Sequence, residues 1–276
     1  MSIRLVPFVA VAISQLAFAG TYLKEVQTTG GLTGMPQQSF SLESWYEGNH
    51  VKRAMVGPDG TTLMVVIMDL KKQEVLLVNP ARQSYAVMPA ELYQQGTQTM
   101  LQAFGVSRNP DGSYIVPKGI FQKTGQKKKI GSWNCYEVKV NAPVLAGGKM
   151  SMWFSTEVGL NQADYVQTLK SQMGADAKAL GPFFDQIGSL AGYPALITTE
   201  MELQGQHITS TQELKQVKKM SIADKEFVVP ATYAKVDASA ATNLGGGAPA
   251  PSGPADPPPP GPQPQTTTPA PTSKSK

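Results

Sequence analysis

Apolar and polar residues alternate in many short segments between residues 20 and 236. An alternation with a period of two places successive side chains on opposite faces of a strand, so each segment predicts a β-strand. In residues 37–47, Phe40, Leu42 and Tyr46 share one face. Turn signals such as Pro58-Asp59-Gly60 separate the segments. Strands are expected at residues 20–28, 37–47, 50–56, 62–68, 74–78, 84–88, 119–129, 133–141, 149–155, 193–203 and 207–218.

The segment 62–68 departs from this alternation because both of its faces are apolar. One face carries Met64, Val66 and Met68, and the other carries Leu63, Val65 and Ile67. A sheet with one solvated side would alternate polar with apolar residues, so a second layer must cover this strand. The pattern leaves open which of the two sets faces that layer.

Three segments have helical periodicity and are expected to supply the covering layer. One begins after Pro89, which suits a first helical turn. Another is capped by Asp164 and carries Leu169, Met173 and Leu180 on one side, while residues 182–190 bring Phe183 and Phe184. Since runs of hairpins exclude a parallel α/β sheet, we expect an α+β fold with helices on the concave side of one curved antiparallel sheet.

The first residues have the pattern of a secretory signal peptide. Arg4 precedes an apolar stretch from Leu5 to Ala12, and Ala17-Phe18-Ala19 precedes Gly20. That stretch is shorter than the roughly 20 apolar residues that span a bilayer. We therefore expect residues 1–19 to be removed after Ala19, and a periplasmic or secreted protein without a transmembrane segment in the mature chain.

The end of the chain, residues 237–276, consists mostly of Ala, Thr, Gly, Pro and Ser, with four prolines in a row at residues 257–260. Such a composition cannot bury enough apolar surface to offset the entropy lost on folding. This predicts a disordered Pro-rich tail after a domain of residues 20–236. The tail is either a spacer that reaches cell wall or an envelope protein, or a segment without a role of its own.

The sequence offers little catalytic chemistry. His50 and His207 lie far apart and no clustered metal ligands accompany them, so both are expected on the surface without a metal. The only cysteine, Cys135, is expected to be buried if a layer covers the face of Trp133. The formal charge of +4 is too small to favour nucleic acid as a partner. These observations predict a protein that is not an enzyme and has no cofactor.

Two further features each allow two interpretations. Lys123 and the run 127–129 either contact an anionic surface or protect the edge of the sheet, and we favour the edge. Methionines on predicted strands and helices either line an adaptable ligand cavity or fill an ordinary core, and the core is the simpler reading. They are Met64, Met68, Met150, Met152, Met173 and Met201.

Three motifs are distinctive in combination. They are Lys129-Ile130-Gly131-Ser132-Trp133-Asn134-Cys135-Tyr136-Glu137-Val138, then Met152-Trp153-Phe154-Ser155 with Gly159-Leu160, and Phe227-Val228-Val229-Pro230-Ala231-Thr232-Tyr233. In these the chain resembles a bacterial secreted domain-of-unknown-function family, the 4412 family, distantly similar to the periplasmic lipoprotein carrier and its outer-membrane receptor. The resemblance covers residues 20–236 and implies an open half-barrel closed by helices over an apolar cavity. The family has no established activity, so no functional residue is transferred.

The leading hypothesis is a cell-envelope protein that binds an apolar ligand between sheet and helices. The ligand would be an acyl chain, a lipid or a lipidated protein. The expected lining residues are Met64, Val66, Met68, Leu169, Met173, Phe183 and Phe184. The alternative is a structural or interaction module that displays the Pro-rich tail and has no small-molecule ligand.

Overall fold

The computed structural model describes residues 20–31, 36–141, 148–160, 162–203 and 205–237. The predicted signal peptide and all but the first residue of the predicted tail lie outside these ranges. The described part is mainly β, with one large sheet and short helices. Its strands are β1 (Thr21–Gly30), β2 (Gln38–Glu47), β3 (His50–Val56), β4 (Thr62–Asp69), β5 (Glu74–Asn79), β6 (Ser84–Val87), β7 (Ser107–Arg108), β8 (Tyr114–Ile115), β9 (Phe121–Ile130), β10 (Trp133–Val140), β11 (Lys149–Ser155), β12 (Tyr193–Leu203), β13 (Gln206–Lys219) and β14 (Ala234–Lys235).

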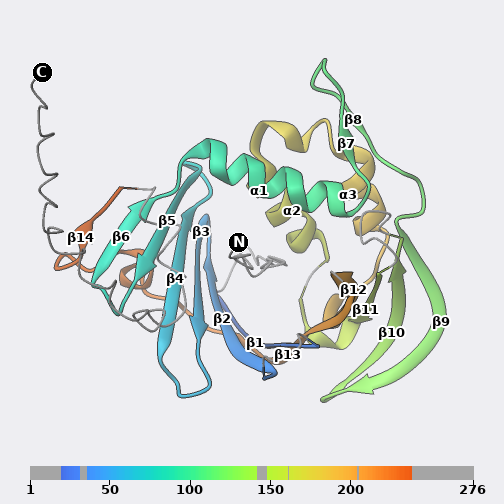
Figure 1. The fold of residues 1–276 in the computed structure, drawn as a ribbon, viewed down its shortest axis with the longest axis horizontal. Coiled ribbons are helices and arrows are strands. Elements are labelled where there is room, and N and C mark those ends of the chain that lie inside the picture. The colour runs from blue at the N-terminus through green and yellow to red at the C-terminus, as the bar shows by residue number, and fades with distance from the viewer. Residues whose placement is uncertain (1–19, 32–35, 142–147, 161, 204, 238–276) are drawn as a thin grey trace, which may run out of the picture. The chain divides into compact units, whose positions relative to one another are not determined.

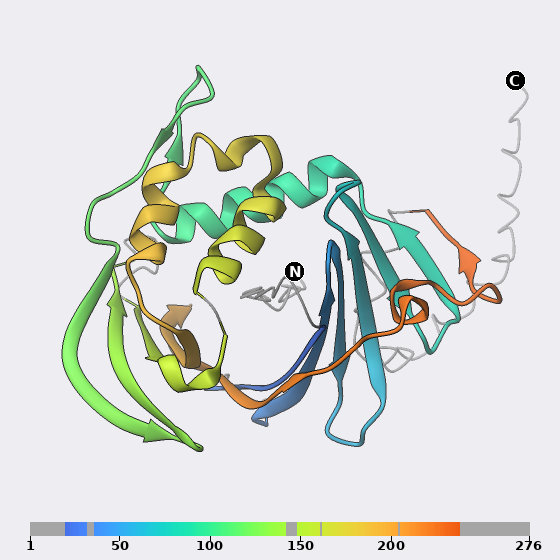
Figure 2. The ribbon, with the colours of Figure 1, turned by 180° about the vertical axis from the view of Figure 1, so that it is seen from behind.

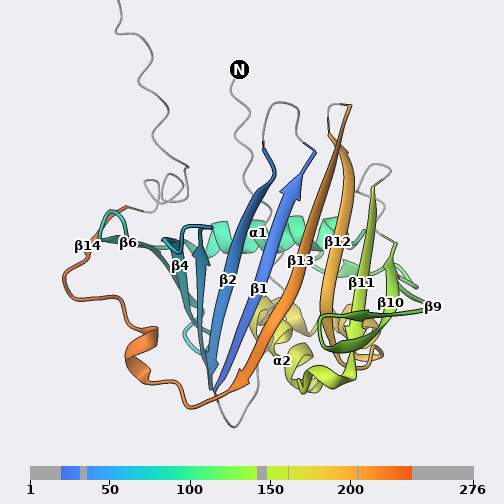
Figure 3. The same ribbon diagram turned by 90° about the horizontal axis from the view of Figure 1, so that it is seen from below.

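Twelve strands form the large sheet in the order β14-β6-β5-β4-β3-β2-β1-β13-β12-β11-β10-β9. Within this sheet the pairs are antiparallel except β14 with β6. The pairing of β1 with β13 joins the N-terminal strands to the C-terminal strands in the middle of the sheet (Figure 3). The eleven strands expected from the sequence are all present, and β7, β8 and β14 were not expected because each has only two residues.

The helices α1 (Ala90–Ala103), α2 (Gln162–Met173) and α3 (Gly181–Gly188) lie across the concave side of the curved sheet (Figures 1 and 2). Pro89 is the N-cap of α1, as expected. The helix predicted from Asp164 to Leu180 is wrong in two respects. Asp164 lies within the first turn of α2, and Leu180 is the N-cap of α3 because a 3-10 turn, Gly174–Ala177, separates the helices.

Strand β4 is covered on both faces, by different parts of the chain. Met68 belongs to the core beneath the helices and Val66 packs against it, whereas Val65 and Ile67 belong to a second core on the opposite face. The cover of this second face is the C-terminal segment, residues 220–236, which contributes Ile222 and Phe227 (Figure 2). This segment contains the 3-10 helix Asp224–Phe227; a further one is Thr156–Val158.

The lysine run lies on β9, an edge strand of the large sheet. Lys127, Lys128 and Lys129 are exposed, and the Lys128 ammonium lies 4.0 Å from the centre of the Trp153 ring. The expected edge position is therefore confirmed. Charged side chains along such an edge oppose pairing with the sheet of another molecule.

Candidate functional site

Most of the predicted ligand residues meet in one place. Met68 of β4, Leu169 and Met173 of α2, and Phe183 and Phe184 of α3 belong to one buried apolar cluster, with 1% to 8% of each residue exposed. Val66 is half-buried and packs against the same cluster. Met64 is half-buried and lies outside the apolar clusters of the described residues. Of the set Met64, Val66 and Met68, the last two therefore face the helices, and Met64 does not join this core.

Helical spacing explains how α2 and α3 reach this cluster. Leu169 and Met173 are four residues apart and therefore share one face of α2. In α3, Phe183, Phe184 and Ile187 are all buried. The Phe183 ring lies 5.5 Å from that of Phe104 and 6.1 Å from that of Phe121, which ties α3 to the end of α1 and to β9. Aromatic contacts at these distances are favourable beyond the area they bury.

Three polar side chains are buried in the middle of the large sheet, on its concave face. Glu25 of β1 is 3% exposed, and Arg53 of β3 is 4% exposed. The Arg53 Nη2 lies 3.4 Å from Glu25 Oε2, and the Tyr193 hydroxyl of β12 donates to Glu25 Oε1 at 3.5 Å. Both partners reach Glu25 across an intervening strand, β2 on one side and β13 on the other. We call Glu25, Arg53 and Tyr193 the central polar cluster.

Burial dominates the electrostatics of this cluster. Loss of hydration raises the pKa of Glu25, although the Arg53 charge and the side chains of Gln212 and Tyr193 act in the opposite direction. Several polar atoms nearby are buried and have no hydrogen-bond partner in the described part of the chain. They are Arg53 Nε, Arg53 Nη1, Ser44 Oγ and Gln27 Oε1. Such groups are uncommon in native interiors because each costs about 1–3 kcal/mol.

The sequence analysis did not identify the central polar cluster. A signal was present, because Arg53 alternates with Val51 and Met55, and Glu25 follows Leu23 by two positions. A charged residue in register with apolar neighbours marks a charge on a buried face. That two such charges meet across β2 depends on the strand order, which alternation does not contain.

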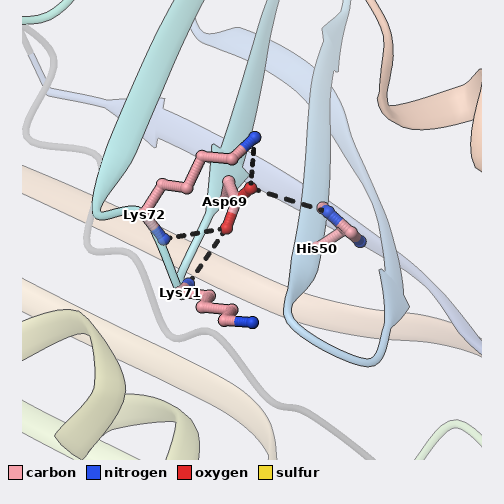
Figure 4. Close-up of polar contacts among 4 residues, drawn as sticks. All are labelled: His50, Asp69, Lys71 and Lys72. Carbon is pink, nitrogen blue, oxygen red and sulfur yellow. Dashed lines mark hydrogen bonds and ion pairs between the residues drawn. The ribbon is translucent and has the colours of Figure 1, made fainter.

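Neither histidine lies in a buried polar cluster. His50 and His207 are exposed, as expected. His50 Nε2 lies 3.8 Å from Asp69 Oδ2, while Asp69 Oδ1 accepts the backbone N–H groups of Lys71 and Lys72, both at 3.0 Å. Figure 4 shows these contacts. Asp69 therefore closes the turn after β4, which is a structural role. In the described ranges no three His, Cys, Asp or Glu side chains are grouped as metal ligands would be.

Cys135 is buried, as expected. It packs with Ile130 and Ala195, and Trp133 and Trp153 cover this small core. Burial raises the pKa of the Cys135 thiol, so the reactive thiolate is disfavoured.

A pocket of about 770 Å³ lies at the end of β10, β11 and β12. Its lining is mixed, with the charged side chains Glu137, Lys139 and Glu200 beside Ile120 and Met150. None of the predicted ligand residues lines it. Of the described helices, none combines the length and the apolar character that crossing a bilayer requires.

Comparisons with solved structures found similar folds at low identity. PNGF-II is 10% identical with a TM-score of 0.36 over 82% of this chain, which spans only 33% of PNGF-II. An uncharacterized conserved protein from Thermus thermophilus is 7% identical, with a TM-score of 0.40 over 78% of this chain and 90% of that one. A LolA superfamily protein from Nitrosomonas europaea is 10% identical, with a TM-score of 0.34 over 79% and 93%.

Comparison with curated proteins found no match. The family model described as "Domain of unknown function (DUF4412)" matches residues 32–233, which is most of the chain and includes the three motifs noted in the sequence. The chain therefore belongs to the DUF4412 family.

Proposed function

We propose that this protein is an exported, non-enzymatic protein of the cell envelope that binds an apolar ligand between the concave face of its sheet and the helices. The observation that carries this proposal is the convergence of Met68, Leu169, Met173, Phe183 and Phe184 in one apolar interior. In this view the sheet is a half-barrel, and the helices α2 and α3 close it over an acyl chain, a lipid or the lipid of a lipidated protein.

The composition of the interior supports an adaptable site. Met152 of β11 joins Met68 and Met173 in the buried cluster, and Met150 packs against it. Methionine side chains are unbranched and polarizable, so they adjust to apolar partners of different shape. This makes an apolar ligand of variable chain length a suitable occupant.

The compartment follows from residues 1–19, which lie outside the described ranges. We propose that they are cleaved after Ala19 and that residues 237–276 form a tail that docks on envelope material. The mass of the protein recovered from the cell envelope should correspond to a chain beginning at Gly20. A mass that includes Met1 would contradict export by cleavage.

Binding is tested with Met68→Glu and with Ile67→Glu as the matched control. Both substitutions place a charge in an apolar core, but Met68 faces the helices and Ile67 faces the C-terminal segment. An unpaired charge at Met68 should abolish binding of a fluorescent fatty acyl probe, because burying it is costly. Ile67→Glu should retain binding in whatever fraction stays folded, as measured by circular dichroism.

Native mass spectrometry of the wild-type protein from its own host should show a retained lipid. If the wild-type protein binds no apolar probe and carries no lipid, the carrier function is wrong. The structural module that displays the tail would then be the better description.

A further inference from the structure

The central polar cluster adjoins apolar residues on the same face of the sheet. Leu23, two positions before Glu25 on β1, and Leu214, the residue paired with Glu25 on β13, are both buried in the apolar cluster. Val66 pairs with Arg53 across β3 and β4, and Met68 pairs with Val51. The charged pair is therefore continuous with the proposed ligand-binding interior.

The charges of this pair balance, but its hydrogen bonds do not. The Glu25 carboxylate neutralises the Arg53 guanidinium through the contact at Nη2. Nε and Nη1 of Arg53 are buried and have no acceptor in the described part of the chain. A guanidinium carries five N–H donors in a fixed plane, so leaving these nitrogens unpaired is costly. A group that pairs with these nitrogens has to accept hydrogen bonds, and it need not carry a charge.

We propose that Arg53 is the polar recognition residue of the interior and donates an N–H group, from Nε or from Nη1, to the uncharged carbonyl oxygen of an acyl ester or amide. This inference rests on the proposed function, since it assigns the polar end of the same apolar ligand. Glu25 is the positioning residue that holds the guanidinium, and Tyr193 in turn holds Glu25 through its hydroxyl.

Ser44 extends this subsite. It lies directly opposite Arg53 in the pairing of β2 with β3, and it is 0% exposed. Its Oγ has no partner among the described residues. A hydroxyl donor beside the guanidinium suits a second oxygen of the same ester group. The acyl chain would run from Arg53 past Val66 toward Met68 and the helices.

A carboxylate fits this subsite less well than a neutral carbonyl. The anion would enter a buried site that already holds the Glu25 carboxylate, and one guanidinium cannot balance both. Like charges close together in a site of low polarity repel strongly. An ester or amide carbonyl accepts an N–H group of Arg53 without adding charge.

The test compares three probes of similar length: tridecane, methyl dodecanoate and dodecanoate. Each competes with a fluorescent apolar probe for the wild-type protein and for the variant Arg53→Met with Glu25→Gln. Removing both charges together avoids leaving one of them unpaired in the interior. The wild-type protein should bind methyl dodecanoate at least about tenfold more tightly than tridecane, as expected for hydrogen bonds to a charged donor. It should also prefer the methyl ester to dodecanoate.

In the double variant the preference for the ester over the alkane should fall to about twofold or less. Ser44→Ala removes a hydroxyl that has no partner among the described residues. It should reduce the ester preference without changing the melting temperature, and it serves if the double variant does not fold. Equal binding of alkane and ester by the wild-type protein, or tighter binding of dodecanoate, would overturn the assignment of Arg53. A wild-type protein that binds none of the probes would instead contradict the proposed function itself.

Discussion

At the scale of single residues, one glycine sets the position of the central polar cluster. Gly192 immediately precedes Tyr193, and its φ of +88° lies in the left-handed region that favours glycine. A Cβ at this position would overlap the Ser155 carbonyl oxygen of β11. The close approach of the two backbones places the start of β12 so that the Tyr193 hydroxyl reaches Glu25.

Gly192→Ala should therefore lower the free energy of unfolding by about 1–3 kcal/mol or more, because strain and a backbone clash combine. Gly96→Ala is the control. Gly96 lies within α1 with nothing within 4 Å of its would-be Cβ, so alanine there should stabilise by about 0.5–1 kcal/mol. Urea denaturation measures both changes. A neutral effect at Gly192 would contradict the close packing of β11 against the start of β12.

At the scale of elements, the C-terminal segment 220–236 acts as a second cover for the sheet. The Lys52 ammonium of β3 lies 2.7 Å from Glu226 Oε2, and the N–H of Met220 donates to the Gly20 carbonyl oxygen at 2.7 Å. The segment ends in β14, which pairs with β6. A segment without regular periodicity thus buries the face of β4 that the helices leave uncovered.

This cover should respond to pH through Glu226. The hydrogen bond and charge of Lys52 lower the pKa of Glu226 below its ordinary value. Its stabilising contribution is therefore complete above the pKa of the unfolded chain and is lost as the pH falls through the lower pKa of the folded protein. Because the pair is partly exposed, Glu226→Gln should cost about 1 kcal/mol or less near neutral pH.

Thermal melts of the wild-type protein and Glu226→Gln at a series of pH values measure this effect. The difference between the two melting temperatures should shrink as the pH falls. Asp224→Asn, which removes a carboxylate of the same turn that forms no ion pair among the described residues, should show no such trend. A difference that stays constant at all pH values would mean that the Lys52 pair does not hold the segment.

At the scale of the whole molecule, the C-terminal segment forms the end of the proposed domain, and the predicted tail follows it. Val236 packs against Leu77 and Ala86, and its N–H donates to the Tyr85 carbonyl oxygen at 2.8 Å. Asp237, the last described residue, is exposed. Truncation after Val236 should change the melting temperature little, because the composition of residues 237–276 predicts a tail that buries little apolar surface.

Truncation after Lys219 is the contrasting variant. It removes Ile222 and Phe227 and uncovers Val65 and Ile67. Each buried apolar side chain contributes roughly 1.5–3 kcal/mol, so the melting temperature should fall by on the order of 10 °C. Differential scanning calorimetry compares the two truncations. A large drop on truncation after Val236 would place the boundary of the domain further along the chain.

The sequence alone determined the local features of this protein. Alternation predicted β1 to β3, β6 and β9 to β13, because the period of two reflects burial along a single strand, and short runs that are apolar on both faces predicted β4 and β5. Helical periodicity predicted that Leu169, Met173, Phe183 and Phe184 cover the sheet. The two apolar faces of β4 predicted that both of them are covered. The three motifs identified the family.

Only the tertiary structure decided which surfaces meet. Alternation separates the two faces of a strand but carries no information on strand order, so the meeting of Glu25, Arg53 and Tyr193 across β2 and β13 was not predictable. The same holds for the choice between Met68 and Ile67 as the residue that faces the helices. The segment 220–236 covers β4 although it has no period of its own. Contacts between residues far apart in sequence depend on how the elements pack, and no local pattern records that packing.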